Sequence, residues 1–233
     1  MVGIIVQLVL SWLILGILQK QSLSALGFYP PKKRILQLFL GLLFASMSCI
    51  LVEILNSELT HLSWKLNDNL NYMDIPNYLW WNLKSVLFEE FIFRGALLYI
   101  AIQRLGAKKG IVLSAICFGI YHWFSYGLFG NIASMVIVFL ITGFMGLIWA
   151  LGFLKSKSMA LPIGLHLGWN FTTNAIFSKG PMGDQILIPV KGLYYTQLTG
   201  VPSLVNFLTQ NIGVTMLTYL FIKFYAQKEC DNY

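Results

Sequence analysis

The chain has 233 residues, of which 57% are hydrophobic and only 11% are charged. A soluble domain carries roughly 25% charged residues, so this composition excludes an ordinary soluble protein. The apolar runs are about 17–25 residues long without period-2 alternation, which predicts membrane helices and not a barrel. The net charge of +7 comes from basic residues in loops, a pattern of membrane topology, and no nucleic-acid partner is expected. We expect an all-α protein, a polytopic bundle of transmembrane helices.

Seven apolar segments are predicted as membrane helices within a single domain, residues 1–233. The first segment lacks a basic n-region and a cleavage signal, so it is expected to be a retained helix. A polar stretch at residues 56–77 follows the second helix, and the Gly- and Pro-rich residues 178–206 are expected to form a loop or re-entrant segment. The predicted helices cover residues 2–18, 35–55, 78–105, 110–124, 131–154, 159–177 and 207–225.

Basic residues are concentrated in every second loop and in the C-terminal tail. The positive-inside rule therefore predicts an outside N-terminus and a cytoplasmic C-terminus. No targeting tail is evident, which favours a multi-pass protein of the bacterial plasma membrane over one of the endoplasmic reticulum. The alternate loops are poor in basic residues and hold only Lys65, Lys84, Lys179 and Lys191.

Three ionisable residues lie within six positions of the third predicted helix: Glu89, Glu90 and Arg94. Ionisable groups at membrane depth are costly, so their default interpretation is functional. Glu90 and Arg94 are spaced i,i+4 and can pair on one face of a helix. Glu89 lies about 100° around the helix and is the less neutralised carboxylate. The alternative is a purely structural ion network, although two carboxylates exceed what one arginine requires.

Two further apolar helices carry polar side chains at i,i+4 spacing. His122 shares a helix face with Phe118, and His166 shares one with Asn170. A lone histidine in an apolar helix is more often a satisfied core residue, and the His166–Asn170 pair alone could be a polar contact between helices. Because three separate helices carry such groups, we favour one active site between the helices.

The motifs E-E-x-x-x-R, F-x-x-x-H and H-x-x-x-N, in this order, resemble those of the CPBP family of intramembrane proteases, also known as Abi or type II CAAX prenyl endopeptidases. The resemblance covers residues 78–177. It implies that Glu89 and His122 activate a water molecule, while His166 and Asn170 stabilise the oxyanion. It also implies a glutamate mechanism without a metal or other cofactor. Structural or orienting roles then fall to Glu90, Arg94 and Phe118.

The leading hypothesis is an endopeptidase that cuts a hydrophobic or lipid-modified peptide at the membrane. One Glu and two His could instead form a zinc site, but His122 and His166 are 44 positions apart and no HExxH motif is present. A second hypothesis is a non-proteolytic protein that binds a partner, such as a bacteriocin-immunity or regulatory protein. A third is a proton-coupled transporter, although the sequence shows no inverted repeat or paired broken helices.

Overall fold

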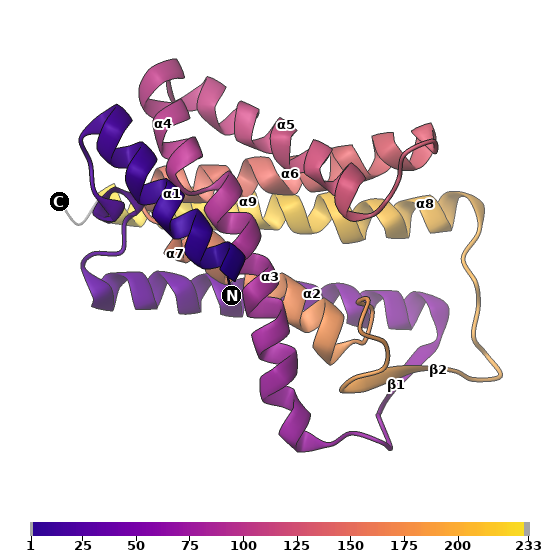
Figure 1. Cartoon of the computed structure of the whole chain (residues 1–233). Coiled ribbons are helices and arrows are strands. Elements are labelled where there is room, and N and C mark those ends of the chain that lie inside the picture. Colours follow the sequence, from indigo (N-terminus) through magenta and orange to yellow (C-terminus); the bar gives the residue numbers. More distant parts are fainter. Residues whose placement is uncertain (1, 231–233) are drawn as a thin grey trace.

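The computed structural model describes residues 2–230, with side chains for residues 2–225. Within that range the chain forms nine α-helices and one antiparallel pair of strands (Figure 1). The strands were not expected from the sequence, which predicts helices alone. The elements are α1 (Val2–Gln19), α2 (Pro31–Thr60), β1 (Leu62–Leu66), α3 (Ile75–Phe93), α4 (Ala96–Leu105), α5 (Ala107–Ser125), α6 (Ile132–Ser156), α7 (Ala160–Phe171), β2 (Leu187–Lys191), α8 (Gly200–Leu208) and α9 (Val214–Cys230).

Four helical segments of the described chain are long and apolar enough to cross a membrane: Val2–Gln19, Leu23–Thr60, Ile132–Ser156 and Gly200–Tyr225. The protein is therefore a polytopic helical membrane protein, as the composition predicts. Seven segments were expected to have this character. The difference arises mainly because α7 has only 12 residues, and because α3 carries Lys84 and two glutamates in an otherwise apolar helix.

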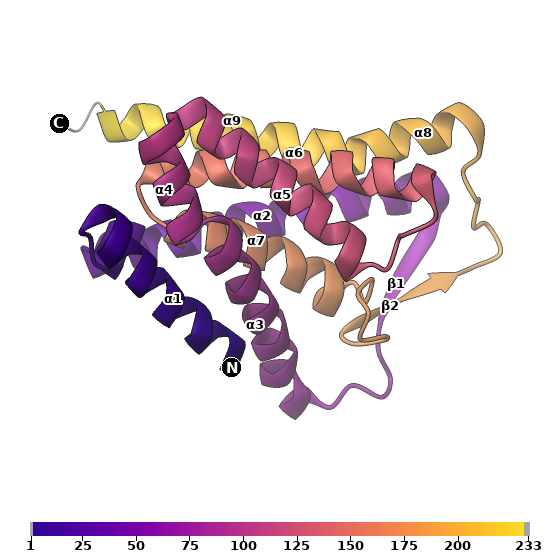
Figure 2. The ribbon, with the colours of Figure 1, turned by 45° about the horizontal axis from the view of Figure 1, so that its top comes forward.

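Helix α7 lies in the centre of the bundle, against α2, α3 and α6 (Figure 2). Two glycines allow α2 to approach it closely. A Cβ atom on Gly164 would lie 2.1 Å from the carbonyl oxygen of Leu38, and one on Gly168 would lie 2.3 Å from that of Leu42. Small residues permit such close approach of membrane helices. Since Gly164 and Gly168 face α2, the intervening His166 points to another side of α7.

The helix is interrupted between α3 and α4, whereas the sequence predicts one continuous helix over residues 78–105. α3 ends at Phe93, and Arg94 and Gly95 separate it from α4. A Cβ atom on Gly95 would lie 2.3 Å from the Phe91 carbonyl oxygen, so the bend requires glycine. The Ser114 hydroxyl of α5 donates a 2.6 Å hydrogen bond to the freed Phe93 carbonyl. The break therefore immediately follows the charged segment of α3.

Strands β1 and β2 pair antiparallel with Leu62 opposite Lys191, and together they form what we call the β arm. Beside the arm, Lys179 pairs with the buried Glu53 of α2, its Nζ 2.5 and 2.6 Å from the two carboxylate oxygens, and lies 5.9 Å from the Trp64 ring of β1. The segment over residues 178–206 is thus more ordered than the expected loop. It contains β2 and α8, and α8 continues through a π-helical turn at Thr209–Gly213 into α9.

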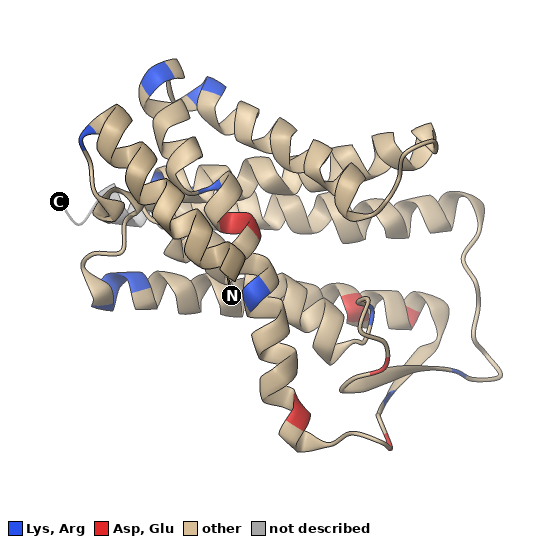
Figure 3. Cartoon of the chain, in the orientation of Figure 1, with Lys and Arg blue, Asp and Glu red and all other residues tan. Residues whose placement is uncertain are grey.

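Charged residues are unevenly distributed over the ribbon (Figure 3). Basic residues gather where α2 begins and where α4 turns into α5, at one end of the bundle. Acidic residues lie elsewhere, on α2, α3 and the loops near the β arm. One red segment, Glu89 and Glu90, lies inside the bundle, where α3 meets the other helices.

Candidate active site

His166 is the centre of a buried polar cluster that joins α3 to α7. Its Nδ1 lies 2.9 Å from Glu90 Oε1. Its Nε2 lies 3.2 Å from Asn170 Nδ2 and 3.8 Å from Glu89 Oε2. A carboxylate only accepts hydrogen bonds, so the hydrogen-bond network assigns the proton of a neutral ring to Nδ1, and Nε2 then accepts from the Asn170 amide. The ring is thereby fixed between two carboxylates on opposite edges.

The two adjacent glutamates have different environments. The Glu90 side chain has no exposed surface, and it contacts both His166 and Arg94. The Glu89 side chain retains 12% exposure, and its Oε2 lies 3.8 Å from His166 Nε2. Glu89 forms no hydrogen bond to any described residue. Of the two carboxylates, Glu89 is therefore the one that a substrate or a water molecule can reach.

Arg94 is fully buried directly after α3, and its NH1 lies 3.3 Å from Glu90 Oε1. Its guanidinium carbon lies 4.1 Å from the centre of the Phe118 ring and 5.2 Å from that of Trp149. Aromatic faces attract cations, most strongly where water is excluded. Arg94 is thus held by the Glu90 carboxylate and an aromatic surface.

Trp149 of α6 supports the cluster, although nothing in the sequence marks it. Its ring stacks on His166 with centroids 4.1 Å apart and an interplanar angle of 26°. It is 4% exposed and also packs against Phe118. A tryptophan within an apolar helix has no motif and no polar neighbour in sequence, so only the packed structure brings it to the site.

His122 of α5 packs against the Phe118 ring, next to the cluster. The Phe118 ring centroid is 4.5 Å from that of His122 and 6.2 Å from that of His166. His122 Nδ1 donates a 2.8 Å hydrogen bond to the Phe118 carbonyl oxygen, which leaves Nε2 as the acceptor. Tyr121 and Tyr126 pack against this ring at 5.4 and 5.3 Å.

The structure thus unites most, but not all, of the residues predicted for the site. Two glutamates, the arginine, the second histidine and the asparagine contact one another directly, and Phe118 packs on Arg94. His122 is next to Phe118 but forms no ion pair or hydrogen bond with Glu89 in the described chain. Among the same residues, no group of three or more His, Cys, Asp or Glu side chains is placed to hold a metal ion.

One known protein family is similar to the part of the chain that carries this cluster. Residues 71–172 match the family model described as type II CAAX prenyl endopeptidase Rce1-like. The curated proteins and the solved structures give no match. The matched segment begins just before α3 and ends just after α7, so it includes all three motifs.

The fold and the buried charges define a polytopic helical membrane protein with ionisable groups between its helices. Within it, residues 71–172 carry a domain similar to that of the Rce1-like type II CAAX prenyl endopeptidase family. The resemblance expected from the short motifs at residues 78–177 is confirmed by this match.

Proposed function

We propose that this chain is an intramembrane endopeptidase that hydrolyses a peptide bond near the carboxyl end of a hydrophobic, lipid-modified peptide. The substrate class rests on the family description, which specifies a prenylated CAAX sequence. The observation that carries the proposal is the difference in surroundings between Glu89 and Glu90, which are adjacent in α3. Glu90 is sealed and neutralised by Arg94, whereas the accessible Glu89 faces His166 without a hydrogen bond.

In the proposed reaction, Glu89 is the general base. It takes a proton from a water molecule, whose oxygen attacks the scissile carbonyl carbon, and it returns the proton to the leaving amine as the peptide bond breaks. His122 accepts a hydrogen bond from the same water at Nε2, since its Nδ1 is already committed to the Phe118 carbonyl. Positioned general bases typically accelerate proton transfers by about 10²–10⁴.

His166 and Asn170 stabilise the oxyanion of the tetrahedral intermediate in this proposal. The Asn170 amide lies 3.2 Å from His166 Nε2, so one developing charge can face both groups. With Nδ1 of His166 held by the Glu90 carboxylate, Nε2 is the ring nitrogen that faces the oxyanion, and in a doubly protonated ring its N–H donates to that oxygen. Donors of this kind are most effective where bulk water is excluded, and His166 is only 3% exposed.

We further propose that α3, α5 and α7 complete the membrane domain with the four long spans, which gives the seven membrane helices predicted from the sequence. The clustered basic residues at the end where α2 begins then face the cytoplasm. With this orientation the protein is a multi-pass component of a bacterial plasma membrane, and the β arm lies on the outer side.

Cleavage by purified protein tests the proposal. Wild-type protein in lipid nanodiscs should release the terminal tripeptide from a farnesylated CAAX peptide, and Glu89→Gln should not. Glu58→Gln, an exposed glutamate on α2, is the matched control and should retain the wild-type rate. EDTA and phenanthroline should leave the rate unchanged, because Glu89 itself supplies the base.

Two results would overturn the proposal. Inhibition by chelators that added zinc reverses would replace the glutamate mechanism by a metal mechanism. Equal biological activity of wild type and Glu89→Gln, without cleavage by either, would favour a partner-binding or immunity protein. That alternative needs a surface but no accessible carboxylate in the interior.

A further inference from the structure

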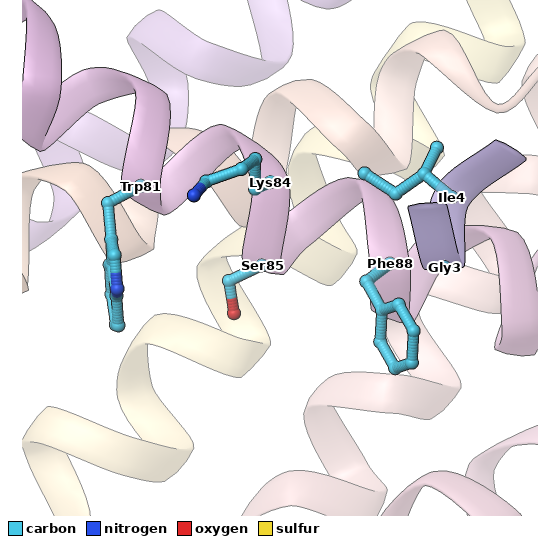
Figure 4. A pocket seen from close by; sticks show the side chains of 6 residues that line it. All are labelled: Gly3, Ile4, Trp81, Lys84, Ser85 and Phe88. Atoms are coloured by element: carbon cyan, nitrogen blue, oxygen red, sulfur yellow. The ribbon is translucent and has the colours of Figure 1, made fainter. Parts of the chain in front are cut away.

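A groove of about 390 Å³ lies between the first turn of α1 and the middle of α3 (Figure 4). Gly3 and Ile4 of α1 form one wall. α3 supplies the rest at positions i, i+3, i+4 and i+7, a spacing that places side chains on one helix face. The residues of that face are Trp81, Lys84, Ser85 and Phe88.

This groove is separate from the candidate active site. Glu90 follows Trp81 by nine positions, which at about 100° per residue is a net rotation of roughly 180°. Glu90 and its contact with His166 are therefore on the opposite side of α3 from Trp81. A peptide bond held in the groove would be separated from the oxyanion donors by the helix itself.

One end of the groove is rich in hydrogen-bond donors. It holds the Lys84 ammonium, the Ser85 hydroxyl and the Trp81 indole N–H. Within the described chain none of these three side chains forms a hydrogen bond or ion pair. Lys84 is also partly buried, ten residues into α3. A lysine in such an apolar helix normally pairs with an anion or reaches an interface, so its charge calls for a ligand.

The other end of the groove is apolar. Phe88 is 37% exposed there, and it packs close to α1, since a Cβ atom on Gly3 would lie 3.1 Å from its ring. From Trp81 to Phe88 the helix rises about 10 Å. The adjacent Trp80 is 44% exposed, and exposed tryptophans mark the level of lipid headgroups. Along α3, the groove therefore passes from a polar, cationic end at the interface to an apolar end.

We propose that this groove is a binding site for an anionic phospholipid. The headgroup phosphate accepts hydrogen bonds from Lys84, Ser85 and Trp81, while an acyl chain lies along Phe88 and Ile4. Charge complementarity selects an anion, and the polar-to-apolar order of the groove matches a headgroup followed by its chain. A lipid is favoured over a peptide carboxylate because the groove and Glu90 occupy opposite sides of α3. The site does not depend on the proposed protease activity.

Native mass spectrometry of the full-length protein tests this site. Detergent-solubilised protein is titrated with phosphatidylglycerol and, separately, with zwitterionic phosphatidylcholine. Wild type should bind phosphatidylglycerol more tightly, and Lys84→Met should weaken that binding about fivefold, the typical effect of one basic residue on an anionic membrane surface. Lys84→Arg should retain it. Lys191→Met removes the same charge from the exposed β arm and should bind as wild type does.

Unchanged phosphatidylglycerol affinity in Lys84→Met, or an equal loss in Lys191→Met, would overturn the proposal. A second readout does not depend on that variant. Phosphatidylglycerol brominated in its acyl chains should quench the fluorescence of wild type more than that of Trp81→Phe, and equal quenching would also overturn the site. Displacement of the lipid by a short peptide acid, but not by its amide, would assign the groove to a peptide carboxylate instead.

Discussion

The Glu53–Lys179 pair beside the β arm and the glutamate cluster in the bundle centre differ in how completely their carboxylates are paired. Among the described residues, Glu53 pairs with Lys179 alone, whose ammonium lies 2.5 and 2.6 Å from the two carboxylate oxygens. In the bundle centre, two glutamates share one arginine and one histidine, and Glu89 is left without a hydrogen bond. A charge-matched pair needs no further function, whereas a surplus carboxylate in a buried cluster is the group to which we assign the proposed chemistry.

Of the substitutions that test this difference, Arg94→Ala is expected to have the largest effect, on the stability of the fold. It removes the cation from a fully buried Glu90, and a buried charge left unpaired costs about 3–5 kcal/mol of folding free energy. The variant should therefore be depleted from membranes and unfold at a lower temperature. Normal accumulation of Arg94→Ala, together with loss of Glu89→Gln, would reverse the roles assigned to these two residues.

Asn170→Ala is expected to affect catalysis without comparable damage to the fold. Its amide is one of two proposed oxyanion donors, and the loss of one donor typically lowers kcat by about 10²–10³. A trace of cleavage should remain because His166 is retained. The measurement is kcat on the CAAX peptide, with the thermal unfolding midpoint as the control. A wild-type rate would remove Asn170 from the site.

Lys179→Ala tests the structural role of the Glu53–Lys179 ion pair. Glu53 is 4% exposed and would lose the one cation that pairs with it in the described chain, but the Lys179 side chain is 32% exposed, so water screens part of the loss. We expect about 1–2 kcal/mol of destabilisation. Hydrogen exchange should increase in β1 and β2, while the rate of peptide cleavage stays near that of wild type. A strong loss of cleavage with unchanged exchange would contradict a structural role.

Trp149→Leu is expected to give the smallest effect. Stacked aromatic pairs contribute about 0.5–1.5 kcal/mol beyond burial, so loss of the ring over His166 should lower kcat roughly three- to tenfold through a less fixed histidine. Trp149→Phe keeps a stacking face and should recover most of the rate. If both variants behave alike, the Trp149 ring acts only as core packing.

Much of the local arrangement follows from sequence because i,i+4 spacing is a property of any helix. It places Glu90 beside Arg94 and Asn170 beside His166, and the structure shows both contacts. The contact between Glu90 and His166 joins residues 76 positions apart. It arises from the packing of α7 against α3, which no local pattern encodes. Sequence reasoning therefore assigned Glu90 to Arg94 alone.

The fold shows the same division between local and distant information. Hydropathy predicts the long apolar spans well, since composition alone decides whether a segment suits lipid. It misses the break at Gly95, because a glycine in an apolar run has the same hydropathy whether the helix bends or not. It also does not predict the β arm, because β1 and β2 lie far apart in the sequence and pair only in the folded chain.

We assign chemistry to Glu89 and a structural role to Glu53, and two matched Glu→Gln substitutions separate these roles. Each variant is measured for both kcat on the CAAX peptide and its thermal unfolding midpoint. Glu89→Gln should lose cleavage by at least about 10²-fold and unfold as wild type does, while Glu53→Gln should unfold at a lower temperature and cleave as wild type does. The opposite pattern, or activity retained in Glu89→Gln, would contradict the account.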